Sequence, residues 1–328
     1  MSAWRILLAD PISDAGRALL AEDARLEVVE RSGLAGDELA RALADVDAVI
    51  VRTMTRITRE SLVSADRLRA IGRAGVGLDN IDVDAATEKG IAVFNTPGAN
   101  TISAAELTFG LILSLSRRIP AADRSMKAGE WDRARFSGFE LHGKTLGLVG
   151  AGRIGGEVAR RARCFGMRVV AFDPLLDDAR ARVLDIESAS LEEVLRRADV
   201  LSLHVPLTPS TAHLINAERL ALMKPSAILV NAARGGVVDE SALIDALEEG
   251  RLAGAALDVY AEEPLPPDHP LRRLGDSVLL VPHIGAATDE ARRNVGIEVA
   301  AAVRRALVEG DVSHAVNAAD LVARDGGV

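Results

Sequence analysis

Short runs of aliphatic residues alternate along most of the chain with longer stretches in which apolar residues recur every three or four positions. In the first hundred residues the aliphatic runs predict strands at Arg5–Ala9, Leu26–Glu30, Ala48–Val51, Ala70–Arg73 and Ala92–Asn95. Amphipathic stretches such as Asp37–Ala44 and Val83–Lys89 lie between these runs and predict helices. Strands that alternate with helices are typical of βαβ units, so we expect a parallel sheet.

The pattern breaks at Asn95–Gly98, where proline and glycine interrupt both periodicities. The sequence then predicts a long helix from about Thr101 to Arg118, with Ser103 and Glu106 as a capping box near its start. A second series of aliphatic runs predicts strands at Thr145–Val149, Arg168–Phe172, Val200–Val205, Ala227–Asn231, Ala255–Val259 and Val278–Val281. We therefore expect a second parallel sheet with short helices between its strands.

After the second series the chain becomes helical again at Thr288–Glu309. Its 328 residues are too many for one ordinary domain and enough for two domains that each bury a core. The fold class we predict is α/β, with two Rossmann-like domains that are each built on a doubly wound parallel sheet. The helix predicted from Thr101 is more apolar than one buried face requires. It either packs inside the monomer or contributes to a contact between subunits.

Composition narrows the classes of partner and compartment. The formal net charge of -9 argues against nucleic acid or an anionic membrane as a partner, so an anionic substrate would need its own local arginines. Cys164 is the only cysteine, which excludes an internal disulfide and a cysteine-based metal site, and we predict no metal. The apolar start of the chain meets Asp10 and Pro11 too early for a signal peptide. Because the apolar stretch Leu107–Leu115 is also too short to span a membrane, we expect a cytoplasmic protein.

A glycine-rich segment follows the first strand of the second series. The spacing Gly150-x-Gly152-x-x-Gly155 lies between that strand and a predicted helix at Gly156–Cys164. Gly150 permits a tight turn, Gly152 lets backbone N–H groups approach a pyrophosphate, and Gly155 allows close packing of helix on strand. The start of the helix adds free N–H donors and partial positive charge. The spacing alone also occurs in ordinary turns, so its neighbourhood decides the interpretation.

A carboxylate at the end of the next strand completes the nucleotide-binding pattern. Asp173 lies roughly 20 residues beyond Gly152, where an acidic side chain accepts hydrogen bonds from the adenosine ribose. The negative charge of Asp173 would repel a 2′-phosphate, which favours NAD over NADP. The second domain is therefore predicted to bind NAD.

Polar residues end three later strands, at the edge of a parallel sheet where ligands bind. Oxidation of a hydroxy acid needs a base for the hydroxyl proton, a cation for the carboxylate and a nicotinamide for the hydride. His283 is the candidate base because histidine titrates nearest neutrality. Arg234 can bind a carboxylate through two parallel N–H bonds, and Glu263 would orient and stabilise an imidazolium. Each residue alone also has a structural explanation, but their combination beside a dinucleotide loop favours catalysis.

The segments that carry these residues resemble one enzyme family. Gly150–Gly155, Asn231–Gly236, Ala255–Val259 with Glu262–Pro264, and Pro282–Thr288 are similar to the NAD-dependent D-2-hydroxyacid dehydrogenases. The resemblance covers essentially the whole chain. It implies that Arg234 holds the substrate carboxylate, that His283 donates or accepts the proton, and that Glu263 is its partner. Formate dehydrogenases of the family have glutamine at the position of Glu263, which disfavours that chemistry here.

The resemblance also implies two sets of binding residues. The cofactor NAD is expected to contact Gly150, Gly152, Arg153, Ile154, Gly155, Asp173, Val205, Pro206, Ala232, Ala233, Arg234, Asp258, His283, Gly285 and Ala286. The substrate is expected to contact Arg52, Arg73, Gly75, Val76, Gly77, Asn100, Arg234 and His283.

The domain arrangement follows from the same resemblance. It implies an NAD-binding domain inserted in a substrate domain, with the active site in the cleft between them. We place the substrate domain at residues 1–98 and 286–328 and the NAD-binding domain at residues 99–285. The family resemblance also favours a homodimer.

The first domain carries arginines that suit a second anionic group on the substrate. Arg52, Arg56 and Arg73 leave the ends of neighbouring predicted strands, so they either converge on such a group or form ordinary surface charge. Gly75 and Gly77 would let backbone N–H groups point at a substrate carboxylate.

These stretches, with Met126–Arg133 and the closing residues His314–Ala318, resemble family members that convert 3-phosphoglycerate to 3-phosphohydroxypyruvate in serine biosynthesis. In those members a residue at the position of Arg133 or Arg135 reaches the site from a partner subunit. Val76 and Val205 depart from the pattern, since threonine is frequent at both positions. We expect no C-terminal regulatory domain and no feedback by serine through one.

Two alternatives stay open. Within the family, a hydroxypyruvate or glyoxylate reductase would use the same catalytic residues without the first-domain arginines. In a different class, the same scaffold serves as an NAD-sensing corepressor that docks peptides in its first domain.

Overall fold

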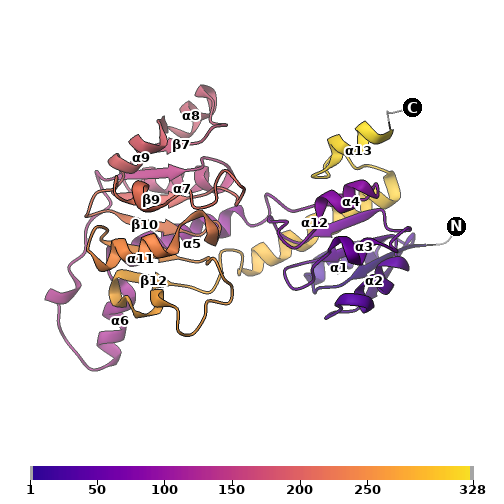
Figure 1. Ribbon diagram of the computed structural model, residues 1–328, viewed down its shortest axis with the longest axis horizontal. Helices are drawn as coiled ribbons and strands as arrows, with labels where there is room; N and C mark the ends of the chain where they lie inside the picture. The colour runs from indigo at the N-terminus through magenta and orange to yellow at the C-terminus, as the bar shows by residue number, and fades with distance from the viewer. Residues whose placement is uncertain (1–2, 326–328) are drawn as a thin grey trace. The chain divides into compact units, whose positions relative to one another are not determined.

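The computed structural model describes residues 3–325, which form two compact units. Unit 1 consists of Met1–Asn100 and Ala287–Val328, and unit 2 consists of Thr101–Ala286, so unit 2 is inserted in the chain between the two parts of unit 1. Each unit contains one sheet, drawn with its covering helices in Figure 1.

Unit 1 is built on a five-stranded parallel sheet in the order β2-β1-β3-β4-β5. The strands are β1 (Trp4–Leu8), β2 (Leu26–Glu30), β3 (Ala48–Val51), β4 (Ala70–Arg73) and β5 (Ala92–Phe94). The helices are α1 (Asp14–Ala21), α2 (Gly36–Ala44), α3 (Arg59–Leu62), α4 (Val83–Glu88), α12 (Asp289–Glu309) and α13 (Ala318–Asp325). Strand β3 is buried along its whole length, because helices cover both faces of the sheet and form a separate apolar core on each.

Unit 2 is built on a seven-stranded parallel sheet in the order β12-β11-β10-β9-β6-β7-β8. The strands are β6 (Thr145–Val149), β7 (Arg168–Phe172), β8 (Glu187–Ser188), β9 (Val200–Leu203), β10 (Ile228–Asn231), β11 (Gly254–Leu257) and β12 (Val278–Leu280). The α-helices are α5 (Thr101–Ser116), α6 (Ile119–Lys127), α7 (Arg153–Cys164), α8 (Asp178–Leu184), α9 (Leu191–Arg197), α10 (Ala217–Leu220) and α11 (Glu240–Glu248), and the 3-10 turns are η1 (Ala134–Phe136), η2 (Gly235–Val237), η3 (Pro270–Arg273) and η4 (Gly275–Ser277). Two apolar cores again lie on opposite faces.

The predicted fold class is confirmed, and most predicted strands agree with the observed ones to within one or two residues. The sequence missed β8, whose two residues, Glu187 and Ser188, are polar and exposed at the edge of the sheet. The capping box was wrong. Ser103 is the third residue of α5 and its buried Oγ has no hydrogen-bond partner among the described residues, while Glu106 accepts from Arg161 at 3.2 Å.

Helix α5 packs inside unit 2. Its buried residues include Phe109, Leu111 and Ile112, and the helix lies against α7, β10 and β11. The apolar character of α5 is therefore accounted for within the monomer. No helix among residues 3–325 is long and apolar enough to cross a membrane.

The strand order determines where ligands can bind. In a doubly wound sheet the connections run in opposite directions on either side of a switch point, which opens a crevice at the carboxyl ends of the two strands concerned. The switch point of unit 2 lies between β6 and β9, and that of unit 1 lies between β1 and β3. The loop that begins at Gly150 follows β6, and Arg52 follows β3.

Candidate active site

The glycine loop of unit 2 has the conformation that its sequence predicts. Gly150 has a φ of 95°, and an added Cβ would lie 2.5 Å from the carbonyl oxygen of His204, so another side chain would not fit. A Cβ at Gly155 would collide with the carbonyl of Gly150, which shows how closely α7 packs on the loop. Gly152 precedes α7, and a Cβ there would meet open space. Because Gly152 is the N-cap residue and has no side chain, no side chain caps the first N–H groups of α7. These N–H groups are available to a pyrophosphate.

Asp173 is held at the end of β7 by the glycine loop itself. Its Oδ2 accepts the N–H of Ala151 at 2.8 Å, and its Oδ1 accepts the N–H of Leu175 at 2.8 Å. A carboxylate oxygen has two lone pairs, so each can still accept a ribose hydroxyl. The residues present thus fit the nucleotide half of NAD.

His204, which sequence reasoning missed, lies beside this loop at the end of β9. Its Nε2 is 2.9 Å from Ser202 Oγ, and burial lowers the pKa of His204 to about 4. The imidazole is therefore neutral near pH 7 and serves to pack the loop. A histidine that follows a strand gives no signal that would separate this role from catalysis.

Glu263 and His283 meet directly in unit 2. Oε2 of Glu263 accepts a hydrogen bond from Nδ1 of His283 at 2.7 Å, although the two residues lie 20 positions apart in the chain. Both side chains are partly exposed. The bond assigns the ring proton to Nδ1, so Nε2 of the neutral ring is the basic nitrogen that can take a proton from a substrate. A carboxylate at Nδ1 also stabilises the imidazolium that this transfer produces.

Asp258 fixes the backbone around His283. His283 has a φ of 53°, a left-handed conformation that costs a residue other than glycine about 1–3 kcal/mol. The carboxylate of Asp258 accepts the next two N–H groups, from Ile284 at 2.6 Å and from Gly285 at 2.9 Å. Burial raises the pKa of Asp258, while the two N–H bonds favour its charged form. This carboxylate holds the turn that presents the histidine.

Tyr260 joins the strand ends that carry Glu263 and His283. Its N–H donates to Oε1 of Glu263 at 3.1 Å, and its hydroxyl lies 2.8 Å from the carbonyl of Val281 and 3.1 Å from that of Leu257. The hydroxyl has one proton to share between two carbonyls, and burial raises the pKa of Tyr260 to about 12. Tyr260 was not identified from sequence, because it lies between the segments Ala255–Val259 and Glu262–Pro264 that carried the resemblance.

Arg234 lies on the loop after β10, which packs against the segment that contains Tyr260 and Ala261. Asn231, the last residue of β10, donates from its side chain to the carbonyl of Arg234 at 2.9 Å and accepts the N–H of Ala233 at 3.1 Å. Gly235 follows, and a Cβ there would collide with the backbone of Tyr260 and Ala261. The Arg234 segment and the Glu263 segment are therefore in contact. The other predicted cofactor residues, Val205, Pro206, Ala232 and Ala286, all lie in loops that follow β9, β10 and β12.

The predicted substrate arginines of unit 1, Arg52 and Arg73, lie at the carboxyl ends of the neighbouring strands β3 and β4. Val51 of β3 pairs with Arg73 of β4, and Arg52 follows β3. The buried carboxylate of Asp10 accepts the backbone N–H of Arg52 at 2.6 Å, and Asn80 donates to the carbonyl of Arg52 at 2.9 Å. The backbone of Arg52 is thus held rigidly at the switch point of the sheet. Asp10 and Asn80 were not identified as site residues from sequence.

The loop after β4 differs in part from the predicted anion site. The N–H of Gly75 donates to the carbonyl of Arg73 at 2.8 Å, and a Cβ at Gly75 would collide with the guanidinium of Arg73. Val76 is held through its carbonyl, which accepts from Asn95 at 2.7 Å. Gly77 follows in the same loop, and Asn100 ends the first part of unit 1 with a buried Oδ1 that has no partner among residues 3–325.

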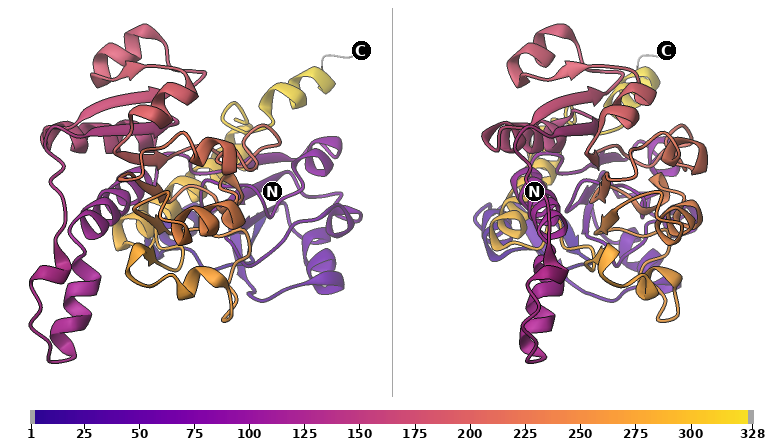
Figure 2. Two further views of the ribbon diagram at one scale, coloured as in Figure 1. Left: turned by 60° about the vertical axis from the view of Figure 1, so that its left-hand side comes forward. Right: turned by 90° about the vertical axis from the view of Figure 1, so that its left-hand side faces the viewer.

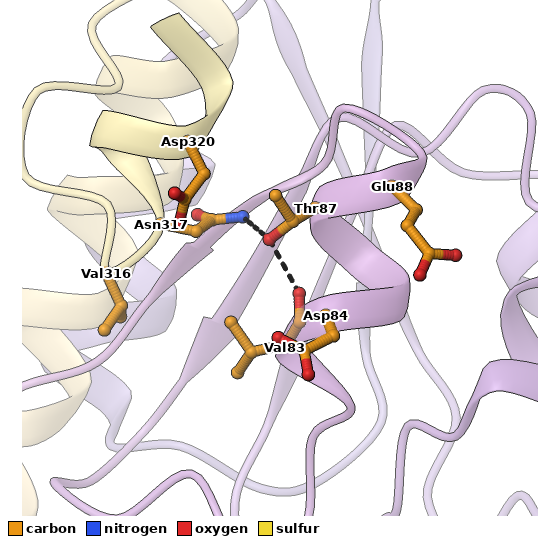
Figure 3. Close-up of a pocket in the computed structure, with 7 residues that line it drawn as sticks. All are labelled: Val83, Asp84, Thr87, Glu88, Val316, Asn317 and Asp320. Atoms are coloured by element: carbon orange, nitrogen blue, oxygen red, sulfur yellow. Dashed lines mark hydrogen bonds between the residues drawn. The ribbon is translucent and has the colours of Figure 1, made fainter. Parts of the chain in front are cut away.

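A separate pocket of about 580 Å³ lies in unit 1 (Figure 3). Its lining residues are Val83, Asp84, Thr87, Glu88, Val316, Asn317 and Asp320. Asn317 belongs to the closing segment and ties it to the sheet, because its side chain bonds the N–H of Val93 at 3.0 Å and the carbonyl of Ile91 at 2.9 Å. The pocket includes none of the predicted site residues, and its three carboxylates would repel an anionic acid.

Comparison with known proteins identifies the class to which this site belongs. Residues 109–285 match the family described as "D-isomer specific 2-hydroxyacid dehydrogenase, NAD binding domain". The chain belongs to the D-isomer specific 2-hydroxyacid dehydrogenases, an NAD-dependent enzyme family, and unit 2 is its NAD-binding domain. The predictions of the family, of an oxidoreductase and of NAD as cofactor are confirmed.

Individual relatives and solved structures show which members of the family this chain is similar to. The chain is 49% identical to D-3-phosphoglycerate dehydrogenase of Methanocaldococcus jannaschii, over 92% of this chain and 57% of that relative, and 48% identical to the enzyme of the same name from Mycobacterium bovis, over 97% and 59%. It therefore spans less than two thirds of these relatives. Among solved structures, the TT0316 protein from Thermus thermophilus is 40% identical with a TM-score of 0.85, covering 93% of this chain and 97% of that one. A glyoxylate reductase from Paecilomyes thermophila is 34% identical with a TM-score of 0.84, covering 95% and 97%.

Proposed function

We propose that this chain uses NAD to interconvert a D-2-hydroxy acid and its 2-keto acid, with His283 as the group that moves the proton. The observation that carries the proposal is the 2.7 Å hydrogen bond from Nδ1 of His283 to Glu263, beside the segment that bears Arg234. A histidine held by a carboxylate, with an arginine on a neighbouring segment, has the parts that oxidation of a hydroxy acid requires.

The catalytic roles follow from these contacts. Bound NAD supplies a nicotinamide ring that accepts the hydride. Arg234 holds the carboxylate of the acid through parallel N–H bonds and so orients the carbon that bears the hydroxyl. Nε2 of His283 takes the hydroxyl proton, and Glu263 stabilises the resulting imidazolium. In the reverse direction the imidazolium returns its proton to the keto oxygen.

The acid that we propose is 3-phosphoglycerate, the serine-biosynthesis substrate that the sequence resemblance implies. The relatives named D-3-phosphoglycerate dehydrogenase support this choice, as do Arg52 and Arg73, two cations at adjacent strand ends of unit 1. We propose that they hold the phosphate. We also propose that the loop Gly75–Gly77, through N–H groups other than that of Gly75, contacts the carboxylate together with Asn100. The similar glyoxylate reductase supports an unphosphorylated acid as the alternative. We place the reaction in the cytoplasm, in keeping with the single Cys164.

Substrate preference separates the two candidates. We expect kcat/KM for 3-phosphohydroxypyruvate with NADH to exceed that for glyoxylate and hydroxypyruvate, because only the phosphorylated acid offers a second anionic group. Replacement of Arg52 or Arg73 by glutamine should lower this value by about 10- to 100-fold, the effect of one lost charge-assisted hydrogen bond, and leave glyoxylate reduction nearly unchanged. Steady-state kinetics under identical conditions measures both.

Arg41 provides the control for these variants. It is an exposed arginine on α2 whose Nε donates to the carbonyl of Asp37, so Arg41→Gln should retain wild-type preference. A wild-type enzyme that prefers glyoxylate or hydroxypyruvate by kcat/KM would contradict the phosphate assignment. Equal losses on all three acids in the Arg52 and Arg73 variants would also contradict it.

We propose that the partner of the chain is a second copy, which it contacts through an arm that consists of residues 117–140. Figure 2 shows this segment, with α6, extending away from the rest of unit 2. The arm exposes Ile119, Met126 and Trp131, the last with 77% of its surface accessible. Large apolar side chains that are exposed on a projecting segment are typical of a protein interface.

Two arginines of the arm, Arg133 and Arg135, differ in their contacts within the chain. Arg135 bonds Asp276 of its own chain at 3.2 Å, whereas Arg133 has no ion-pair partner among residues 3–325. Arg133 is therefore the better candidate to reach the site of a partner subunit.

We expect light scattering to give about twice the chain mass of 34.6 kDa. Trp131→Ser should lower that mass toward the monomer at micromolar concentration, since a buried aromatic anchor contributes about 2 kcal/mol or more to an interface. The exposed Leu175, which lies outside the arm, offers the control Leu175→Ser, whose mass should match wild type. A wild-type monomer would refute the dimer.

A further inference from the structure

Glu240, which neither the motifs nor the proposed mechanism uses, has a neighbour from another segment at each carboxylate oxygen. It is the first residue of α11, and its side chain is mostly buried. Oε1 accepts the backbone N–H of Ala261 at 2.6 Å, and Oε2 lies 3.4 Å from Nε2 of His269. A mostly buried carboxylate that accepts a backbone N–H of another loop and faces a histidine there does more than begin a helix, a position where any acidic residue would be favourable.

The bonds of His269 show which of its nitrogens carries the proton. Its Nδ1 accepts the N–H of Leu271 at 3.4 Å, at the start of η3, so Nδ1 is unprotonated in this arrangement. The proton is then on Nε2, which faces the carboxylate of Glu240. His269 thus supports Glu240 in the same way that a second partner orients a metal- or substrate-binding side chain.

The loop that Glu240 holds is the one that carries Glu263. Ala261 lies between Tyr260, whose N–H donates to Glu263, and Glu263 itself. On the other side, Glu240 follows closely after Gly235, which packs against the backbone of Tyr260 and Ala261. One carboxylate therefore joins the segment that bears Arg234 to the segment that bears Glu263.

We propose that Glu240 is a positioning residue for the hydride-transfer reaction: its bond to Ala261 sets Glu263 against His283 and fixes both relative to Arg234. The inference rests on the proposed function, because it assumes that Glu263, His283 and Arg234 act on one substrate. Glu240 itself touches neither substrate nor cofactor and acts through the backbone of the loop.

The test compares three variants of Glu240 in the full-length protein. Glu240→Ala removes the acceptor, and Glu240→Asp keeps the charge but shortens the reach. Glu240→Gln keeps an oxygen that can accept from Ala261. We expect the alanine and aspartate variants to lose about 10- to 100-fold in kcat, with the KM for NADH nearly unchanged, and the glutamine variant to stay within a few-fold of wild type.

A kinetic isotope effect separates positioning from general damage. A misplaced Glu263 slows the chemical step, so the deuterium isotope effect on kcat with 4-deuterated NADH should rise in Glu240→Ala and Glu240→Asp. A variant that was merely partly unfolded would lose active enzyme and keep the wild-type isotope effect. Hydrogen exchange read by mass spectrometry should show faster exchange at the Ala261 amide in the same two variants.

Glu248 provides the matched control. It is an exposed glutamate on the same helix, and Glu248→Ala makes the same change of charge and size. It should retain wild-type kcat, isotope effect and amide exchange. Wild-type kcat and isotope effect in Glu240→Ala would overturn the inference, as would a loss of kcat that glutamine does not restore. If the alanine variant does not fold, the comparison of aspartate with glutamine decides.

The choice of acid keeps this test independent of the substrate assignment. The measurements use whichever 2-keto acid the wild type reduces best, because Glu240 contacts none of them. A preference for glyoxylate over the phosphorylated acid would therefore refute the phosphate proposal and leave the positioning role to be decided by the variants. A wild type that reduced none of the acids would refute both.

Discussion

Replacement of His283 by asparagine is expected to lower kcat by about 10²- to 10⁴-fold, the usual contribution of a general acid–base group. Asparagine preserves a polar side chain that can still donate to Glu263, so the loss reports the missing proton acceptor at the position of Nε2. Asparagine also tolerates the left-handed backbone of residue 283 better than most residues, which protects the fold of the turn.

The measurement pairs turnover with cofactor binding. NADH affinity, followed by fluorescence titration, should stay within a few-fold of wild type, because the glycine loop and Asp173 lie on other strands. His142→Asn, at an exposed histidine outside the site, should leave both quantities unchanged. Normal turnover in His283→Asn would remove His283 from its assigned role.

Replacement of Arg234 by lysine is expected to lower kcat/KM for the keto acid by about 30- to 1000-fold. Lysine keeps the charge but cannot donate two parallel N–H bonds to a carboxylate, and lost charge-assisted hydrogen bonds of this kind are each worth about 1.5–3 kcal/mol. The substrate would then bind weakly and in variable orientations, so both KM and kcat should change.

Stopped-flow and steady-state kinetics together resolve the two effects. Arg251→Lys is the matched control, because Arg251 is a partly exposed arginine of unit 2 that pairs with Glu249. A result in which Arg234→Lys matched wild type in kcat/KM would show that the carboxylate is held elsewhere. A fall in NADH affinity as large as the fall in kcat/KM would instead assign Arg234 to the cofactor.

Local pattern was sufficient for most of the fold. Strand β3 is Ala48–Val51, as its run of aliphatic residues predicted, because a strand buried on both faces must be apolar at every position. The exceptions lie where burial gives no such signal. Strand β8 is two exposed polar residues at a sheet edge, and Ser103 lies inside α5 because the helix begins at Thr101.

The residues of the candidate site also fall into two groups, those that the sequence could suggest and those that only the structure reveals. The glycine spacing, Asp173, Arg234, Glu263 and His283 could be proposed from sequence because each chemical task requires a particular residue type at a strand end. Tyr260, Glu240 and Asp10 could not be. Each acts through a hydrogen bond to the backbone of another loop, and such a bond is compatible with many residue types and leaves no spacing in the chain.

Residue pattern alone predicted two α/β units, a glycine loop for NAD and the groups that we propose to act on a hydroxy acid. The strand order decided the rest, since β6 lies beside β9 and β11 lies beside β12 only in the folded sheet. That order brings Nδ1 of His283 to Glu263 and the carboxylate of Asp258 to the turn after His283. Hydrogen bonds act over about 3 Å, a distance that chain separation does not encode, so these pairs exist only in the tertiary structure.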